Sequence, residues 1–170
     1  MKILHNIHFY KLLLISLVII PLTSWQLSEP ALKKLANEIS ALNKKTDLPQ
    51  GRNIYLILPN QGCEGCITSA EQYTQDNYNN PHIYYVFTRI NSVKLLRLIL
   101  TNKVFYSNHI LLDTANKITY PDDNMKIYPM VAFGDKGKIS RIEYQSPASD
   151  GLKDIDAYLS QSTIQKSSKL

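Results

Sequence analysis

The chain has 170 residues, with 19 lysines and arginines against 14 aspartates and glutamates, and it contains only two cysteines. This length suits a single domain with one buried core. The basic residues are scattered along the chain rather than gathered in a stripe, so the composition argues against a nucleic-acid-binding protein.

The N-terminal segment has the layout of a secretory signal. Residues 1–11 carry Lys2 and Lys11 and no acid, and residues 12–22 are almost uninterruptedly apolar. This apolar run is shorter than the ~20 residues that cross a bilayer, which favours cleavage near Ser24 over a permanent anchor. We therefore expect residues 1–24 to be a signal peptide or N-terminal membrane anchor. The protein should be exported to the periplasm or cell envelope, secreted or membrane-anchored, and any membrane contact should run through this segment if it is uncleaved.

Residues 25–52 are predicted to form a helix and a linker. Ser28 can cap the helix, Glu29 places an acid in its first turn, and Pro30 lacks only an N–H that would be unpaired there. Apolar residues then recur at helical spacing and form one packing face. They are Leu32, Leu35, Ala36, Ile39 and Leu42.

Both cysteines lie in one short stretch that follows an apolar, strand-like run at residues 54–58. The residues beyond them lack proline and glycine until Pro81, so the pattern predicts a strand, a tight loop and a helix. Cys63 would then begin the helix. The unpaired N–H groups and the macrodipole there favour the thiolate, which is the form that attacks a disulfide.

Two other interpretations of Cys63 and Cys66 remain open. A structural zinc site normally needs four ligands, whereas the chain has no further cysteine, and His82 and His109 each stand at the head of a strand-like run. A permanently closed disulfide suits an oxidising compartment. A bridge across so short a loop, however, removes little entropy from the unfolded chain.

The rest of the chain alternates predicted strands and helices. Apolar runs predict strands at 83–87 and 110–112, the second ending in Asp113. A helix is predicted at 92–103, and its many apolar positions indicate that it is well buried. An irregular surface connection then leads to Pro129, which must open its strand. The remaining elements are a glycine-containing turn at 134–138, a strand at 139–144, an amphipathic helix at 151–159 and a flexible tail at 161–170.

The order of these features resembles the thioredoxin-like superfamily over about 53–159. The features are the apolar strand, Cys63-Glu64-Gly65-Cys66 on a helix, a strand–helix unit and Pro129 opening a strand. The extra helix and strand before Pro129 resemble the AhpC/TSA and TlpA/ResA-type branch of extracytoplasmic thiol-disulfide oxidoreductases. The resemblance implies an α/β, thioredoxin-like fold over residues 53–160, with a central mixed sheet of four or five strands flanked by helices.

The same resemblance implies roles for site residues. Cys63 would be the catalytic nucleophile and Cys66 the more buried, resolving thiol. Pro129 would be cis and lie beside them, and the backbone of Tyr128 would pair with a substrate chain. The partners would be protein disulfides or dithiols and an upstream reductant. No cofactor or metal is implied, because thiol exchange carries the electrons.

Two departures from the family pattern leave alternatives open. Gly62 replaces the aromatic residue that usually precedes the first cysteine, and Ile57 replaces a buried acid, so no proton acceptor for Cys66 is identified. A non-catalytic thioredoxin-fold binding module, or a soft-metal delivery protein, therefore remains an alternative. A peroxidase would need a threonine or serine and an arginine near a lone cysteine, and the sequence shows no such arrangement.

Glu64 is expected to tune the pKa of Cys63. A carboxylate ~7 Å away opposes the thiolate by roughly 0.6 kcal/mol in water. The helix N-terminus favours the thiolate by about 0.3–1 kcal/mol, so the two effects nearly cancel. We therefore expect a reductant or isomerase-like exchanger, with a potential nearer about −270 mV than about −120 mV.

Overall fold

The computed structural model describes residues 29–43 and 48–160; the predicted signal segment, Ser28 and the tail at 161–170 lie outside the described residues. A five-stranded sheet with the order β3-β2-β1-β4-β5 forms the centre of the protein. The strands are β1 (Asn53–Pro59), β2 (Ile83–Thr88), β3 (Ile110–Asp113), β4 (Met130–Asp135) and β5 (Lys138–Tyr144). The first three run parallel, β4 runs antiparallel to β1, and β5 runs antiparallel to β4. This is the mixed sheet of an α/β, thioredoxin-like fold, as predicted.

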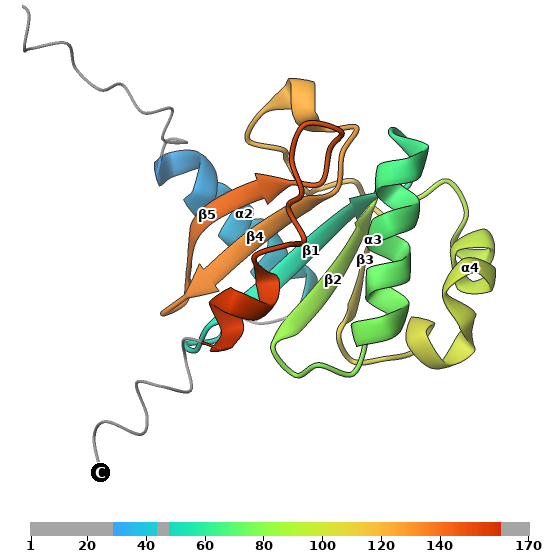
Figure 1. The fold of residues 1–170 in the computed structure, drawn as a ribbon, viewed down its shortest axis with the longest axis horizontal. Coiled ribbons are helices and arrows are strands. Elements are labelled where there is room, and N and C mark those ends of the chain that lie inside the picture. Colours follow the sequence, from blue (N-terminus) through green and yellow to red (C-terminus); the bar gives the residue numbers. More distant parts are fainter. Residues whose placement is uncertain (1–28, 44–47, 161–170) are drawn as a thin grey trace, which may run out of the picture.

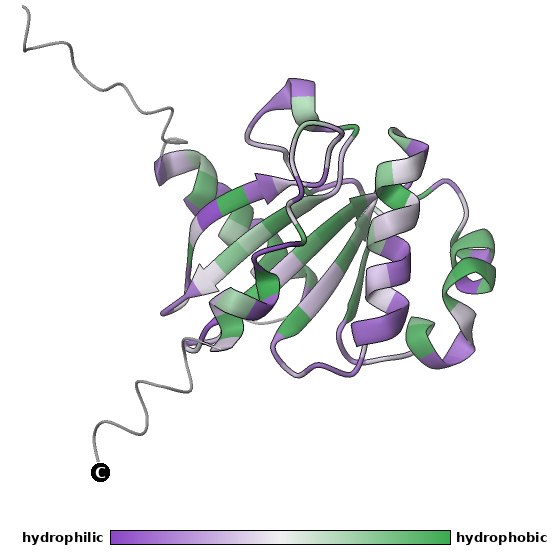
Figure 2. Cartoon of the chain, viewed as in Figure 1, coloured by the Kyte–Doolittle hydropathy of each residue, from purple (hydrophilic) through white to green (hydrophobic). Residues whose placement is uncertain are grey.

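Helices cover both faces of the sheet (Figure 1). Helix α2 (Glu29–Leu42) lies on one face; α3 (Glu64–Asn77), α4 (Val93–Phe105) and helical residues 155–160 lie on the other. Every residue of β1 is buried, which explains why its sequence is continuously apolar rather than alternating. Its odd-numbered apolar residues pack under α2 and its even-numbered ones under α3, giving two apolar clusters. In Figure 2 the central strands are largely hydrophobic, whereas α3 carries mostly hydrophilic residues.

Several sequence-based predictions are confirmed in detail. The predicted apolar face of α2 is buried, apart from Leu42, which is only partly buried. Lys136 and Gly137 form a two-residue turn between β4 and β5, and both have positive φ, as a hairpin turn of this length requires. The closing helix is shorter than predicted, because residues 151–154 form turns and the helical residues begin at the fully buried Ile155.

Helix α4 contradicts the prediction that it is well buried. Only Leu96, Leu100 and Val104 are buried, at a spacing of four residues that forms one narrow stripe. In Figure 1, α4 lies at the margin of the molecule beside α3, so it meets the protein along that stripe alone. Phe105 is partly buried, and four other large apolar side chains are exposed: Val93, Leu95, Leu98 and Ile99.

The connection between β3 and β4 is irregular, as predicted, and contains one short 3-10 helix, η1 (Asp123–Met125). It does not run wholly over the surface, because Ile118 and Tyr120 are buried in the cluster beneath α2. Within the described ranges, no helix is long and apolar enough to span a membrane.

The strand directions bring three loops to one edge of the sheet. The cysteine loop follows β1, Arg89 follows β2, and the segment before Met130 leads into β4, which starts at the edge where the parallel β1 and β2 end. The carboxyl ends of parallel strands are the usual place for a site in open α/β sheets. The two cysteines therefore lie where the fold can surround them with residues from distant parts of the chain.

Candidate functional site

Cys63 and Cys66 form a disulfide, with their Cα atoms 5.3 Å apart. Cys63 is the N-cap residue of α3, with extended backbone angles, and Cys66 lies in the first turn of the helix. Cys63 is half-buried, whereas Cys66 is only 9% exposed. The predicted position of Cys63 and the greater burial of Cys66 are both confirmed.

This arrangement determines which sulfur a partner can reach. No side chain caps the start of α3, so the N–H groups of its first turn, which follows Cys63, have no capping side chain as a partner. These groups and the helix dipole would stabilise a Cys63 thiolate after reduction. A partner molecule can approach Cys63 from solvent, whereas Cys66 is shielded and suited to an intramolecular attack.

The loop before β4 contacts the cysteine loop directly. The N–H of Cys63 donates a 2.9 Å hydrogen bond to the carbonyl oxygen of Ile127. Gly62 has φ +150°, and a Cβ atom added there would lie 2.7 Å from the Cα of Ile127. The close approach of the two backbones thus explains why a glycine precedes Cys63 in place of an aromatic residue.

The predicted cis bond at Pro129 is wrong: within the described residues every peptide bond is trans. A turn in which the N–H of Tyr128 donates to the carbonyl of Met125 brings Ile127, rather than Tyr128, against Cys63. Pro129 itself is buried, and Ile127 is 40% exposed beside the disulfide. A substrate-binding role for Tyr128 and Pro129 stays a prediction.

Tyr120 is hydrogen-bonded to the same loop from the buried side. Its hydroxyl donates a 3.2 Å hydrogen bond to the carbonyl oxygen of Tyr128, and its ring stacks on that of Tyr144. Burial raises the pKa of the Tyr120 hydroxyl, with a smaller contribution from Tyr144, so the group remains a protonated donor. The loop that faces Cys63 is therefore fixed at its far end.

Arg89 is a site residue that sequence reasoning missed. Its Nη1 atom donates to the carbonyl oxygens of Lys126, at 2.9 Å, and of Gln61, at 3.4 Å, so its guanidinium bridges the two loops that meet at Cys63. These bonds place an arginine side chain close to the cysteine loop, although the cysteines are a bonded pair and not the lone cysteine of a peroxidase. A sequence signal was present, because Arg89 lies two residues beyond the strand predicted at 83–87, and the carboxyl ends of parallel strands lie side by side.

The acids near the site have different surroundings. Glu64 is exposed in the first turn of α3, where the sequence placed it. Ile57 is fully buried among apolar side chains, so no carboxylate lies at the position where thioredoxin-like proteins usually have a buried acid. Asp113 is also fully buried, and its carboxylate accepts hydrogen bonds from the Thr88 hydroxyl and from the N–H groups of Lys117 and Ile118. Asp113 therefore caps the backbone N–H groups at the start of the connection that follows β3.

The fold and the disulfide together define an α/β protein with a thioredoxin-like sheet and a Cys-x-x-Cys pair at a helix start. Across the described ranges, no group of three or more histidine, cysteine or acidic side chains is placed to hold a metal ion. No protein-family model and no curated protein matches this chain. The geometry of the site is therefore the basis for any functional assignment.

Proposed function

We propose that the protein is an extracytoplasmic thiol-disulfide oxidoreductase of the thioredoxin-like superfamily, similar to its TlpA/ResA-type branch. The observation that carries the proposal is the unequal exposure of the bonded pair: Cys63 is half-buried at the N-cap of α3, and Cys66 is shielded in the first turn. An inert structural bridge does not need one accessible sulfur at a helix start. A thiol exchanger does, because the attacking thiolate must reach a partner.

The mechanism begins with both thiols reduced. The Cys63 thiolate attacks one sulfur of a partner disulfide, which forms a mixed disulfide and releases the other partner sulfur as a thiolate. Cys66, deprotonated, then attacks the Cys63 sulfur; the Cys63–Cys66 bond forms, and the partner leaves with two thiols after taking up protons. Two electrons have passed to the partner, and an upstream dithiol reductant restores the pair.

Single cysteine variants test this assignment. Cys63→Ser should abolish dithiothreitol-dependent reduction of insulin. Cys66→Ser should also lose turnover but should accumulate a mixed disulfide through Cys63, visible by mass spectrometry, since the resolving thiol is missing. The wild type should turn over. Stoichiometric copper(I) binding by the reduced wild type without turnover would instead support a soft-metal delivery protein.

The Glu64 carboxylate should lower the reduction potential of the pair. Glu64→Gln removes a charge that opposes the thiolate by roughly 0.6 kcal/mol, so the reduced form is stabilised and the potential should rise by about 10–15 mV. Glutathione-equilibrium titration measures this shift. Asp76→Asn, at the far end of α3, removes the same charge and should leave the potential unchanged. A wild-type potential above about −150 mV, or no shift in Glu64→Gln, would show that the acid does not set the potential.

Export forms part of the proposal and rests on residues 1–24 of the sequence. The basic start and the apolar run should direct the chain out of the cytoplasm. Cell fractionation with N-terminal sequencing should find the protein in the envelope, either shortened near Ser24 or held in the membrane. Full-length, soluble protein in the cytoplasm would overturn the extracytoplasmic assignment.

A further inference from the structure

The outer face of α4 exposes aliphatic side chains that no element of the described fold covers. Leu98 is 68% exposed and Leu95 is 54% exposed; they lie three residues apart and therefore share the helix face opposite the buried stripe. In Figure 2 this helix lies at the margin of the molecule and is largely hydrophobic, with hydrophilic positions between the apolar ones. Exposed leucines gathered on one helix face mark a surface that meets an apolar environment.

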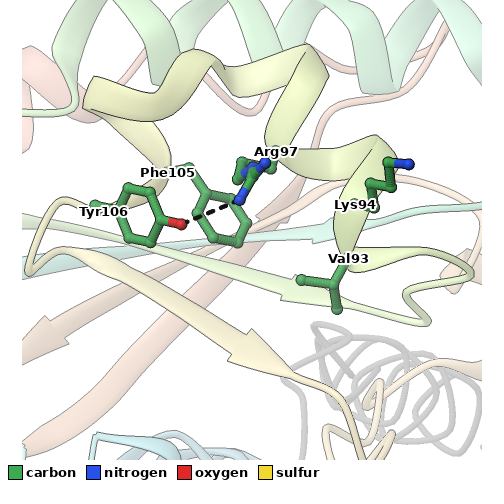
Figure 3. Close-up of a pocket in the computed structure, with 5 residues that line it drawn as sticks. All are labelled: Val93, Lys94, Arg97, Phe105 and Tyr106. Carbon is green, nitrogen blue, oxygen red and sulfur yellow. Dashed lines mark hydrogen bonds between the residues drawn. The ribbon is translucent and has the colours of Figure 1, made fainter.

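This face is flanked by cations and by an open pocket. Residues 89–112 contain four lysines and arginines and no acid. Lys94 and Arg97 line a pocket of about 380 Å³ together with Val93, Phe105 and Tyr106. Figure 3 shows Arg97 reaching toward the Tyr106 hydroxyl, to which its Nη1 donates a 3.3 Å hydrogen bond. A guanidinium has five N–H donors, so Arg97 retains donors for an anionic group.

The shape of α4 opens this pocket. Thr101 has φ +64° and interrupts the helix, so the segment after it turns back and brings Phe105 and Tyr106 beside the first two turns. The exposed aliphatic side chains of α4 therefore lie next to a pocket that is lined by cationic and aromatic residues. Helices that lie in the interface of anionic membranes typically combine leucines with lysines and arginines.

We propose that the outer face of α4 docks on an anionic phospholipid surface, with Leu95 and Leu98 in the acyl boundary and Lys94 and Arg97 against the headgroup phosphates. A second copy of the chain fits this face poorly, because a two-fold interface would set its cations against one another and residues 89–112 offer no acid to pair with them. A protein partner fits less well, since leucine is under-represented among the residues that dominate protein interfaces. The apolar run at residues 12–22 also predicts that the chain passes through or stays at a membrane.

Hydrogen exchange of the full-length chain with vesicles tests the proposal and does not depend on redox activity. In the presence of phosphatidylglycerol vesicles, backbone hydrogens in peptides covering 93–105 should exchange more slowly. Phosphatidylcholine vesicles should not slow their exchange, and peptides covering α3 should be unaffected by either. Because exchange is read locally, binding through residues 12–22 does not mimic this result. A titration gives the vesicle concentration for half-maximal protection.

Removing the two cations, Lys94→Gln with Arg97→Gln, should raise that concentration about 30-fold, since each base near an anionic surface contributes about fivefold. The control variant, Lys136→Gln with Lys138→Gln, removes the same charge at the β4–β5 hairpin. It should change the vesicle concentration for half-maximal protection little. Leu95→Ser with Leu98→Ser replaces only exposed side chains and should also weaken protection. Unchanged exchange at 93–105 with phosphatidylglycerol, equal protection by phosphatidylcholine, or protection that depends on protein concentration without vesicles would overturn the proposal.

Discussion

Replacing Asp113 with alanine is expected to lower the free energy of unfolding by about 4 kcal/mol, because a buried carboxylate with three hydrogen-bond donors would be lost. The carboxylate accepts hydrogen bonds of 2.8 Å from Thr88 and Lys117 and of 2.9 Å from Ile118, and Asp113 is fully buried. Alanine would leave these donors without their acceptor, and a buried donor left unpaired costs about 1–3 kcal/mol. Domains of this size have only about 5–15 kcal/mol of stability, so the variant should lose a large share of it.

Two milder variants should stay folded, so that their free energies of unfolding can be measured by urea denaturation. Asp113→Asn retains one acceptor oxygen but turns an NH₂ group toward a donor, so it should cost about half as much. Thr88→Val removes a single hydroxyl donor at similar volume and should cost about 1 kcal/mol. If Asp113→Asn and Thr88→Val both unfold at the wild-type midpoint, the buried carboxylate does not hold the connection between β3 and β4.

Gly62→Ala is expected to lower the free energy of unfolding of the oxidised protein by about 2–4 kcal/mol. Gly62 has φ +150°, and the new Cβ would lie 2.7 Å from backbone atoms of Ile127. Backbone cannot yield as a flexible side chain can, so the loop before β4 must move away and the hydrogen bond from Cys63 to Ile127 would break. We expect the same variant to lose disulfide-exchange activity, because Ile127 would no longer lie beside Cys63.

Gly65→Ala is the matched control, because it lies in the same motif and adds the same methyl group. Gly65 is helical, and nothing lies within 4 Å of a Cβ added there. Alanine should therefore stabilise the oxidised protein by about 0.5–1 kcal/mol, since glycine is the poorer residue in a helix. Equal stabilities for Gly62→Ala and Gly65→Ala, measured by thermal unfolding, would contradict the close approach of the two loops.

The difference between these two glycines shows where sequence reasoning stops. The strand before Cys63 and the helix after it follow from local patterns: the apolar run of β1 and a stretch without proline or glycine. From the sequence, Gly62 was only a departure from a family pattern. Its reason lies in Ile127, more than sixty residues further along the chain, which only the folded arrangement brings into contact.

Helix α4 shows a second limit of the same kind. Its sequence predicted a helix from Ser92, and the Ser92 side chain does cap it. Many apolar positions also predicted deep burial, which is wrong, because periodicity reports which residues could be buried and not how many neighbours a helix will have. Since α3 lies between α4 and much of the sheet, one stripe of α4 is enough to attach it, and its leucines remain outside.

The sequence by itself determined the order of strands and helices, the position of the two cysteines at a helix start and the side of α2 that packs inward, because each depends on residues within a few positions of one another. The tertiary structure alone decided that Ile127 faces Cys63, that Arg89 bridges the two loops and that Asp113 caps the connection after β3. These contacts join the ends of strands separated along the chain, and their geometry is set by strand order and loop path, which local patterns do not encode.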